Sequence, residues 1–231
     1  QQQLLTARQF SIEYEAQFVD DAGAIFPQAV VEACIRPQLA EASPQPAPSV
    51  AGVDWGRYRD FTALVVLREA TGTWQAVCVE RLPQTTWQVQ LERLLRRLGD
   101  WTVCRVCCDA TGAGDPLVEQ LIQRLYESRQ NVQVEPVLFT ARSKRSLIES
   151  LALAMEERKV AIPPHPDLLR ELHAFTATRA RGGHFRLQAQ EGEHADLVIA
   201  LALAVHAAGG GVPSTAPMRP LTSGRTREGM R

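Results

Sequence analysis

The sequence predicts an α/β fold in which a mixed central sheet is flanked by helices. Three short apolar runs near the start of the core are joined by short connections, which is typical of an antiparallel meander. Helical and strand-like stretches alternate after them, and a helix between two strands makes a right-handed crossover between parallel strands. A hydrophobic share of 45% and a charged share of 22% exclude collagen, coiled coil and global disorder.

Three flanking stretches differ in composition from this core. The range 37–49 contains Pro37, Pro44, Pro46 and Pro48, a density that helix interiors and central strands do not accept, so we expect a linker there. Residues 1–36 precede it with helix-like and acidic stretches. Residues 209–231 carry four Arg against one Glu and few apolar side chains, which predicts a flexible basic tail. The folded core is therefore expected at residues 50–208.

The first half of the core is the predicted meander. Its strands are expected at 50–53, 61–67 and 74–81, and the first of them ends at Asp54. A helix is expected at 86–98, because leucines recur there at helical spacing.

The second half of the core alternates strands and helices. We expect a strand at 103–108, a helix at 115–128, a strand at 132–138, a helix at 143–158, a hairpin formed by 175–179 and 184–188, and a helix at 193–208. The pair Gly182–Gly183 supplies the turn chemistry that a hairpin requires.

The cysteines and the apolar runs indicate in which cellular compartment the protein works. An odd count of five cysteines predicts reduced thiols rather than a disulfide framework. Cys104 and Cys107 form a CxxC pair without a second pair or a nearby His, so we interpret them as core thiols of a strand. We predict neither a membrane span nor a signal peptide. Since the chain begins at Gln1 rather than Met, we expect a fragment of a longer protein.

Asp54, Asp109 and Asp196 are the candidate chemical groups. The first two end strands, and the third lies in the first turn of the last helix. If the first and fourth strands are parallel neighbours, their carboxyl ends meet at one edge of the sheet, where ligands bind in such folds. Clustered carboxylates need a cation in order to ionise together, and hard oxygen ligands favour Mg²⁺ or Mn²⁺. Each Asp taken alone also suits a turn or a helix start.

Basic side chains gather in two stretches near these acids. The net charge is only −1, so a nucleic-acid surface must be a local patch. The candidate phosphate contacts are Arg142, Lys144 and Arg145 before a helix, and Arg179, Arg181, His184 and Arg186 on the hairpin. Such contacts hold a nucleic-acid backbone without reading its sequence. The alternative is a solvated hairpin with ordinary surface charge.

The element order and the three aspartates resemble the RNase H-like nuclease fold, and more narrowly the C-terminal nuclease domain of the large terminase subunit of tailed bacteriophages. GVDWGRYRDFTAL resembles the first motif of that family, CCDATGAGDPLVEQL its second, and EGEHADLVIALALA its third. FSIEYEAQFVDDAGAIF is similar to the segment that leads out of the family's ATPase domain. ARSKRSLIESLALAMEERKVAIP is similar to its helix after the last sheet strand, so the likeness covers about residues 10–207.

The resemblance implies roles for individual residues. Asp54, Asp109 and Asp196 would be the catalytic metal ligands of a two-metal site. Asp60 matches an additional acid after the first motif and would hold a water or Lys144, although it also suits a turn before a strand. His194 would lie within reach of the site. The family often carries two adjacent acids in the third motif, whereas Ala195 precedes Asp196 here.

The function implied by the resemblance is a metal-dependent endonuclease that cuts double-stranded concatemeric viral DNA during packaging, with low sequence specificity. Residues 1–36 would then lead out of an ATPase domain that this chain lacks, since no GxxxxGK[ST] motif occurs. The implied partners are that ATPase domain, the small terminase subunit and the portal, the implied location is the host cytoplasm, and the isolated domain is expected to be a monomer.

Two other functions remain open at this point. The same core serves resolvases and transposases, although the EYEAQF segment and the basic tail favour a terminase. A packaging module that binds DNA or the portal without cutting is the second alternative, and the intact set of three acids argues against it.

Overall fold

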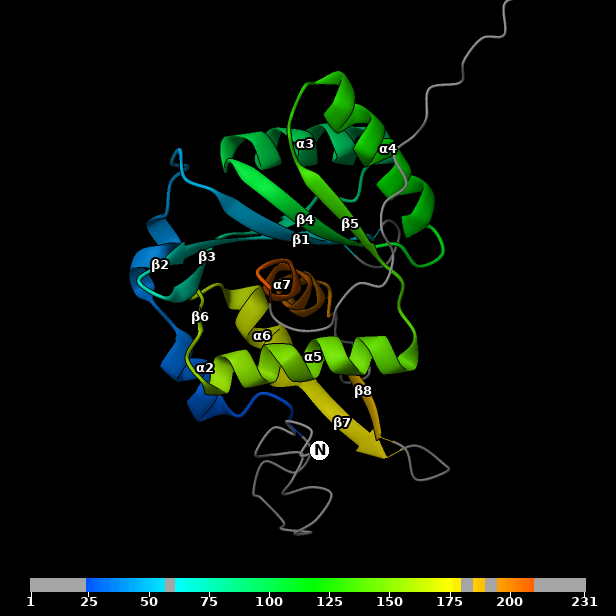
Figure 1. Ribbon diagram of the computed structural model, residues 1–231. Coiled ribbons are helices and arrows are strands. Elements are labelled where there is room, and N and C mark those ends of the chain that lie inside the picture. The colour runs from blue at the N-terminus through cyan, green and yellow to red at the C-terminus, as the bar shows by residue number, and fades with distance from the viewer. Residues whose placement is uncertain (1–23, 57–60, 180–184, 190–194, 210–231) are drawn as a thin grey trace, which may run out of the picture.

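The computed structural model describes residues 24–56, 61–179, 185–189 and 195–209, which form a mixed sheet with helices on both faces (Figure 1). The six-stranded sheet has the order β5-β4-β1-β2-β3-β6. Its strands are β1 (Ser49–Asp54), β2 (Thr62–Ala70), β3 (Thr73–Leu82), β4 (Val103–Asp109), β5 (Gln133–Val137) and β6 (Val160–Ala161). A separate two-stranded sheet pairs β7 (Phe175–Arg179) with β8 (Phe185–Ala189).

The helices cover both faces of the larger sheet. They are α2 (Gln28–Cys34), the 3-10 helix η2 (Pro37–Glu41), α3 (Trp87–Asp100), α4 (Gly114–Glu127), α5 (Ala141–Glu156), α6 (Pro166–Ala174) and α7 (Asp196–Ala207). None of the helices in these described ranges combines the length and the apolar character that crossing a bilayer requires.

The strand pairing confirms the mixed sheet predicted from the sequence. β1 and β2 pair antiparallel, and so do β2 and β3, which is the expected meander. β4 pairs parallel to β1, and β5 pairs parallel to β4. The helices α3 and α4 are the crossovers that parallel pairing demands, and the hairpin of β7 and β8 is antiparallel as expected.

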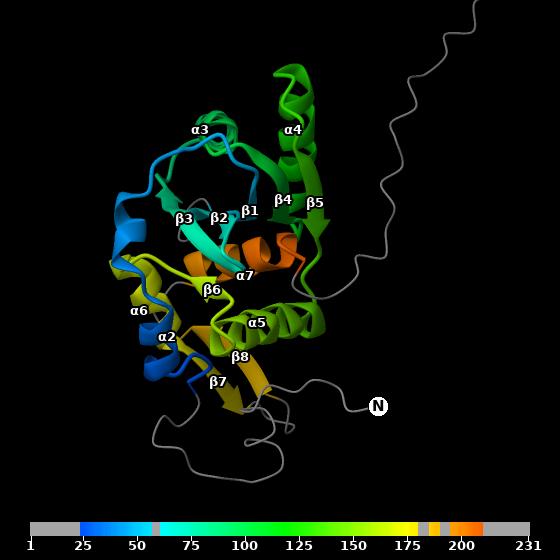
Figure 2. The ribbon, with the colours of Figure 1, turned by 60° about the vertical axis from the view of Figure 1, so that its left-hand side comes forward.

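The sheet has a separate apolar core on each face. Ala51, Val53 and Cys108 point to the face packed by α3 and α4. Val50 and Cys107 point to the opposite face, which α7 covers. Helices α5 and α6 lie beyond α7 (Figures 1 and 2), so α7 is enclosed between the sheet and a second helical layer. This explains why every residue of α7 other than His206 is buried and why its sequence is apolar on all sides.

Gly52 in β1 allows α7 to lie directly on the sheet. A Cβ atom added at Gly52 would stand 2.1 Å from the Ala200 carbonyl oxygen and 2.3 Å from the Ala204 amide nitrogen. No side chain fits that space, so the backbones of β1 and α7 approach as closely as glycine permits. The contact fixes the register of α7 along β1, and with it the place of Asp196 at the start of the helix.

Some local features differ from the sequence-based expectation. The strand β6 and the helix α6 were not expected, because β6 has only two residues and α6 begins at Pro166 within a proline-rich stretch. Cys107 is buried as predicted, but Cys104 is exposed, so its interpretation as a core thiol is wrong. Successive side chains of a strand point to opposite faces, so two cysteines that are three residues apart lie on opposite faces of β4. The two thiols of the CxxC pair therefore differ in exposure.

The residues that precede β1 pack on the same core. Phe26, Val31 and Cys34 are buried in the cluster that contains α7. Within the proline-rich range 37–49, η2 forms and buries Leu39. The described segment before β1 is therefore joined to the core by apolar contacts.

Candidate active site

Asp54 and Asp109 lie at the ends of two neighbouring parallel strands. Val53 of β1 pairs with Cys108 of β4, so the next residue of each strand is an aspartate at the same edge. Side chains alternate along a strand, and Asp54 therefore shares the face of Gly52 while Asp109 shares the face of Cys107. Both of those residues face α7. Neighbouring strands are about 4.8 Å apart, so the two aspartates are adjacent on one face.

Asp196 reaches the same edge from α7. It is the first residue of the helix, and only 7% of it is exposed. Its Oδ2 accepts a hydrogen bond from the Phe61 amide at 2.9 Å. Phe61 immediately precedes β2, whose Ala63 pairs with Asp54. The fold thus brings the three predicted aspartates to one end of the sheet, on the side of α7.

Glu171 of α6 holds the first turn of α7. Its Oε2 accepts hydrogen bonds from the amides of Leu197, at 2.8 Å, and Val198, at 3.0 Å, which are among the amides that a helix start leaves without partners. Glu171 is buried and forms an ion pair with Arg81 of β3. Burial raises the pKa of the Glu171 carboxyl, the Arg81 guanidinium lowers it, and the charge of Asp196 adds to the rise.

Arg81 closes these contacts into a ring around Asp196. Its guanidinium carbon lies 5.1 Å from the centre of the Phe61 ring, and Phe61 is the residue whose amide binds Asp196. Sequence reasoning missed Arg81 and Glu171, because α6 was not predicted and nothing in the sequence connects a residue of β3 with one of α6. In this ring the Phe61 amide holds the Asp196 carboxylate, and Glu171 holds the helix turn that carries it.

Asp109 is held by the loop that follows β4. Its Oδ1 accepts a hydrogen bond from the Thr111 amide at 2.8 Å. Burial raises the pKa of the Asp109 carboxyl, while the Thr111 hydrogen bonds and the positive charge of Lys144 lower it. Lys144 lies in the first turn of α5, and its Nζ stands 5.9 Å from the centre of the Phe139 ring. The structure therefore places the predicted supporting Lys144 in the electrostatic range of Asp109.

The other predicted residues are placed in part. Asp60, His194, Arg181 and His184 lie outside the described residues. Arg179 and Arg186 belong to β7 and β8, which lie beyond α5 and α6 as seen from the larger sheet (Figures 1 and 2). Arg142 and Arg145 lie in the first turns of α5 beside Lys144, and Arg145 pairs with Glu149 at 3.6 Å.

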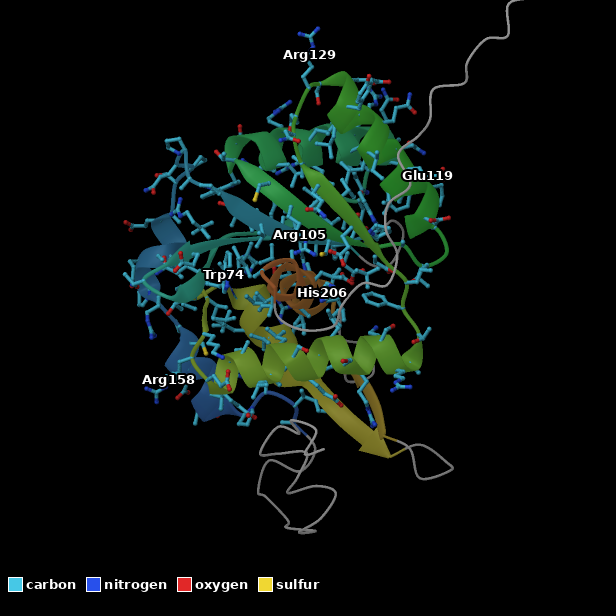
Figure 3. All side chains as sticks on the ribbon, in the orientation of Figure 1. Trp74, Arg105, Glu119, Arg129, Arg158 and His206 are labelled. Carbon is cyan, nitrogen blue, oxygen red and sulfur yellow. The ribbon has the colours of Figure 1, made fainter. Side chains whose placement is uncertain are left out.

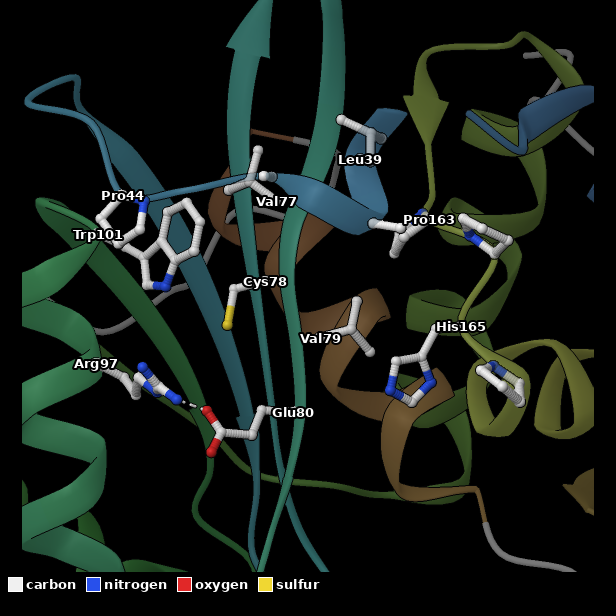
Figure 4. Close-up of a pocket in the computed structure, with 14 residues that line it drawn as sticks. Leu39, Pro44, Val77, Cys78, Val79, Glu80, Arg97, Trp101, Pro163 and His165 are labelled. Carbon is white, nitrogen blue, oxygen red and sulfur yellow. Dashed lines mark hydrogen bonds and ion pairs between the residues drawn. The ribbon is translucent and has the colours of Figure 1, made fainter. Parts of the chain in front are cut away.

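A pocket of about 560 Å³ lies along the outer edge of β3, away from the three aspartates. Its lining includes Trp101, Pro163 and His165 together with the Glu80–Arg97 ion pair (Figure 4). In the described ranges β6 covers β3 only at Trp74 and Gln75, which leaves this edge accessible. None of the three aspartates lines the pocket, so it is separate from the acidic site.

The acidic site offers carboxylate oxygens to a cation. Such hard ligands suit Mg²⁺ and Mn²⁺. Within the described part of the chain, the ligand atoms of the three aspartates do not all come within 4.8 Å of one another. A single ion would therefore not touch all three carboxylates without a shift of the side chains.

Comparison with known proteins agrees with this geometry. Residues 51–208 match the family model described as the terminase RNaseH-like domain. The large terminase subunit of Thermus virus P23-45 is 34% identical over 154 residues, which cover 66% of this chain and 30% of that protein. The chain thus spans about 30% of the length of this curated relative.

Solved structures show the same similarity. The crystal structure of the large terminase nuclease from thermophilic phage G20c with bound magnesium has a TM-score of 0.66 and 28% identity, covering 80% of this chain and 97% of that one. The nuclease domain of the large terminase of Thermus phage P74-26 has a TM-score of 0.59 and 30% identity, covering 71% and 81%. Further structures of the G20c nuclease hold cobalt or zinc.

Proposed function

The chain belongs to the terminase RNase H-like family, and from that membership we propose that it is a divalent-metal-dependent endonuclease that cuts double-stranded concatemeric viral DNA during genome packaging. The observation that carries the proposal is the convergence of Asp54, Asp109 and Asp196 at one end of the sheet. The intact acidic set separates this function from that of a packaging module that only binds DNA or the portal.

The three aspartates would together bind two Mg²⁺ or Mn²⁺ ions. Asp54 lies between the other two in the fold. Strand β1 is next to β4 on one side and to β2 on the other, and Phe61, the amide partner of Asp196, immediately precedes β2. Asp54, Asp109 and Asp196 would therefore be the residues that hold the ions. When bound, the ions would supply activation of a water molecule and neutralisation of the leaving oxygen.

The residues of this chain fit such ions. Burial raises the pKa of Asp109, so its carboxylate carries an energetic cost that a cation would remove. The Phe61 amide holds one oxygen of Asp196, which orients the carboxylate at the edge of the sheet. Ala195 precedes Asp196 where the family resemblance implies a second acid, so this segment would supply the single carboxylate of Asp196.

DNA would be held mainly through its backbone. Lys144 and Arg142 lie in the first turn of α5 on the side of Asp109, and cations at that place suit phosphates. No base-specific pattern is required, so cutting should show low sequence specificity. As further parts of the proposal, the enzyme works in the host cytoplasm with the terminase ATPase domain, the small subunit and the portal.

The test is cleavage of a supercoiled plasmid by the purified chain with Mg²⁺, Mn²⁺, Ca²⁺ or EDTA. We expect cutting with Mg²⁺ or Mn²⁺ and none with EDTA. Asp54→Asn should abolish cutting while the thermal unfolding midpoint stays equal or rises, because removing one clustered charge relieves repulsion. Asp100→Asn, at the exposed end of α3, is the matched control and should cut normally.

Two results would contradict the proposal. Normal cutting by Asp54→Asn would remove that residue from the site. If the folded chain cuts under no condition, Mn²⁺ binding measured by calorimetry decides. Binding that Asp54→Asn loses would retain the metal site and indicate that cutting needs the partners, whereas absence of binding would favour the non-catalytic module.

A further inference from the structure

A second cluster of potential metal ligands lies where β4, β5 and the end of α7 meet. Its members are Cys107, Glu135 and His206, whose ligand atoms all lie within 4.8 Å of one another. Cys107 and Glu135 are paired residues of the two parallel strands, so their side chains share the face toward α7. The His206 Nε2 stands 3.3 Å from the Glu135 Oε1. Cys107 and Glu135 are buried, and His206 is partly buried.

This cluster is separate from the three aspartates. Helix α7 starts with Asp196 and carries His206 in its last turn. A rise of about 1.5 Å per residue puts His206 about 15 Å further along the helix axis than Asp196. Glu135 lies on β5, on the opposite side of β4 from Asp54 and β1. Figure 3 shows His206 on α7 close to Arg105.

In this structure Arg105 provides the positive charge that pairs with the carboxylate of this cluster. Its guanidinium forms an ion pair with Glu135 and donates a hydrogen bond to the Ala207 carbonyl at 3.3 Å. The pairing is incomplete, because the Arg105 Nε is buried without a hydrogen-bond partner among the described residues. The Arg105 side chain is 34% exposed, so it can turn into solvent if another cation takes its place on Glu135.

We propose that Cys107, Glu135 and His206 form a zinc-binding site, with water in the fourth position. Sulfur, imidazole and carboxylate ligands together select Zn²⁺ over Mg²⁺ or Mn²⁺, which prefer oxygen alone. Tetrahedral Zn²⁺ needs ligand atoms roughly 3.3–3.7 Å apart. The Glu135 and His206 atoms already have that spacing, and the Cys107 sulfur lies within 4.8 Å of both.

Binding exchanges one cation for another within the cluster. The Cys107 thiol proton passes to solvent as the sulfur binds the metal, and the Arg105 guanidinium leaves Glu135. The thiolate and the carboxylate together neutralise the two charges of Zn²⁺. The ion would then tie the last turn of α7 to both β4 and β5. The site does not depend on the nuclease activity proposed above.

The test is titration of the metal-free chain with Co²⁺ in place of Zn²⁺, followed by absorbance. Thiolate bound to Co²⁺ gives a near-ultraviolet charge-transfer band, which a purely carboxylate site cannot give. We expect the band to saturate at one Co²⁺ per chain and to disappear when Zn²⁺ is added. Cys107→Ala should lack the band, and the matched control Cys104→Ala, which removes the exposed thiol of the same strand, should keep it.

Three further variants test the roles of Arg105 and His206 and the independence of this site from Asp54. Arg105→Ala should bind Co²⁺ several-fold more tightly, because the competing guanidinium is gone. His206→Gln should bind more weakly while its fold, followed by circular dichroism in EDTA, is retained. Asp54→Asn should keep the band, which separates this site from the acidic one. Zn²⁺ in 100-fold excess over its dissociation constant should raise the unfolding midpoint of the wild-type chain by about 5 °C or more.

The proposal is overturned if the wild-type chain shows no band, if Cys107→Ala keeps it, or if Cys104→Ala loses it. It is also overturned if Arg105→Ala loses stability in EDTA without a gain in metal affinity, since the cluster would then be an ion-pair network alone.

Discussion

At the scale of single residues, the pKa of Asp109 is set by burial against its local contacts. Burial raises the pKa of Asp109, and the Thr111 hydrogen bonds and Lys144 only partly oppose it. A carboxyl whose pKa is raised by folding holds its proton more tightly in the folded chain than in the unfolded one. Where Asp109 is ionised in the folded chain, its charge therefore lowers the free energy of unfolding.

Asp109→Asn should accordingly raise the stability of the metal-free chain at pH 7. The difference from the wild-type chain should shrink as the pH falls through the raised pKa, because the wild-type carboxyl then becomes neutral as well. With Mn²⁺ the order should reverse, since the variant loses a ligand. Thermal unfolding in EDTA and in Mn²⁺ between pH 4 and pH 8 measures both effects; a difference that grows toward acid pH would contradict this account of Asp109.

Glu171 is the residue on which the position of Asp196 depends. Glu171→Ala would leave the Leu197 and Val198 amides without their acceptor and Arg81 without its buried partner. We expect a loss of about 2–4 kcal/mol in the free energy of unfolding. Glu171→Gln should cost less, because an amide oxygen still accepts from both amides.

The cutting rate separates positioning from stability in this series. Measured well below the unfolding midpoint, Glu171→Ala should cut more slowly than Glu171→Gln, which should cut more slowly than the wild-type chain. Urea unfolding supplies the stabilities at the same temperature. Equal cutting rates in all three proteins would mean that the contacts of Glu171 stabilise the fold without aligning Asp196.

At the scale of elements, the sequence predicts the parts whose pattern is local. The meander follows from apolar runs and short turns, the crossovers follow from alternating periodicities, and the hairpin follows from Gly182–Gly183. The helix α7 is recognisable because it is apolar on all sides. β6 was not predicted, since a two-residue strand has no periodicity and its pairing depends on the strands packed around it. α6 was not predicted because it begins at Pro166 within a proline-rich stretch.

The candidate site was predictable to the same extent. Asp54, Asp109 and Asp196 could be singled out from the sequence because each stands at the end of a recognisable strand or at the start of a recognisable helix. Arg81 and Glu171 depend on contacts between elements that the sequence does not connect. The same holds for Cys107, which the sequence left without a His, whereas the fold brings His206 to it from the far end of α7.

The contact of α7 with β1 yields a prediction of its own. Gly52→Ala would push a methyl group into the backbone of α7 at Ala200 and Ala204. We expect a loss of about 3 kcal/mol or more, at the upper end of overpacking effects, and a loss of cutting, because α7 carries Asp196. Gly99→Ala is the control: it lies in α3 with its nearest contact at 3.5 Å, and it should be neutral or stabilising by about 0.5–1 kcal/mol.

Thermal unfolding and plasmid cutting of the two glycine variants measure this contact. If Gly52→Ala unfolds and cuts like Gly99→Ala, the close approach of α7 to β1 is absent in solution. Loss of both stability and cutting in Gly52→Ala alone would support the role of β1 in positioning Asp196.

At the scale of the whole molecule, charge decides how DNA is bound. The net charge of −1 provides no general attraction for a polyanion, so affinity must come from a local basic surface. Arg142 and Lys144 lie at the start of α5, on the side of the sheet where β4 and β5 end. Arg129, which precedes β5, lies at the other end of that strand (Figure 3). A DNA backbone that is held beside Asp109 should therefore contact α5 and not Arg129.

The salt dependence of DNA binding tests this orientation. Each phosphate contact contributes about 0.9 to the slope of log affinity against log salt concentration, so Arg142→Ala should weaken binding and reduce the slope by about 0.9. Arg181→Ala should do the same if the hairpin contacts DNA, as we infer from its sequence. Arg129→Ala should leave both quantities unchanged. With duplexes of different sequence the losses should be equal, because backbone contacts carry no base preference. If instead Arg129→Ala changes the slope and Arg142→Ala does not, DNA approaches the opposite end of the sheet, and the acidic site cannot be where it is cut.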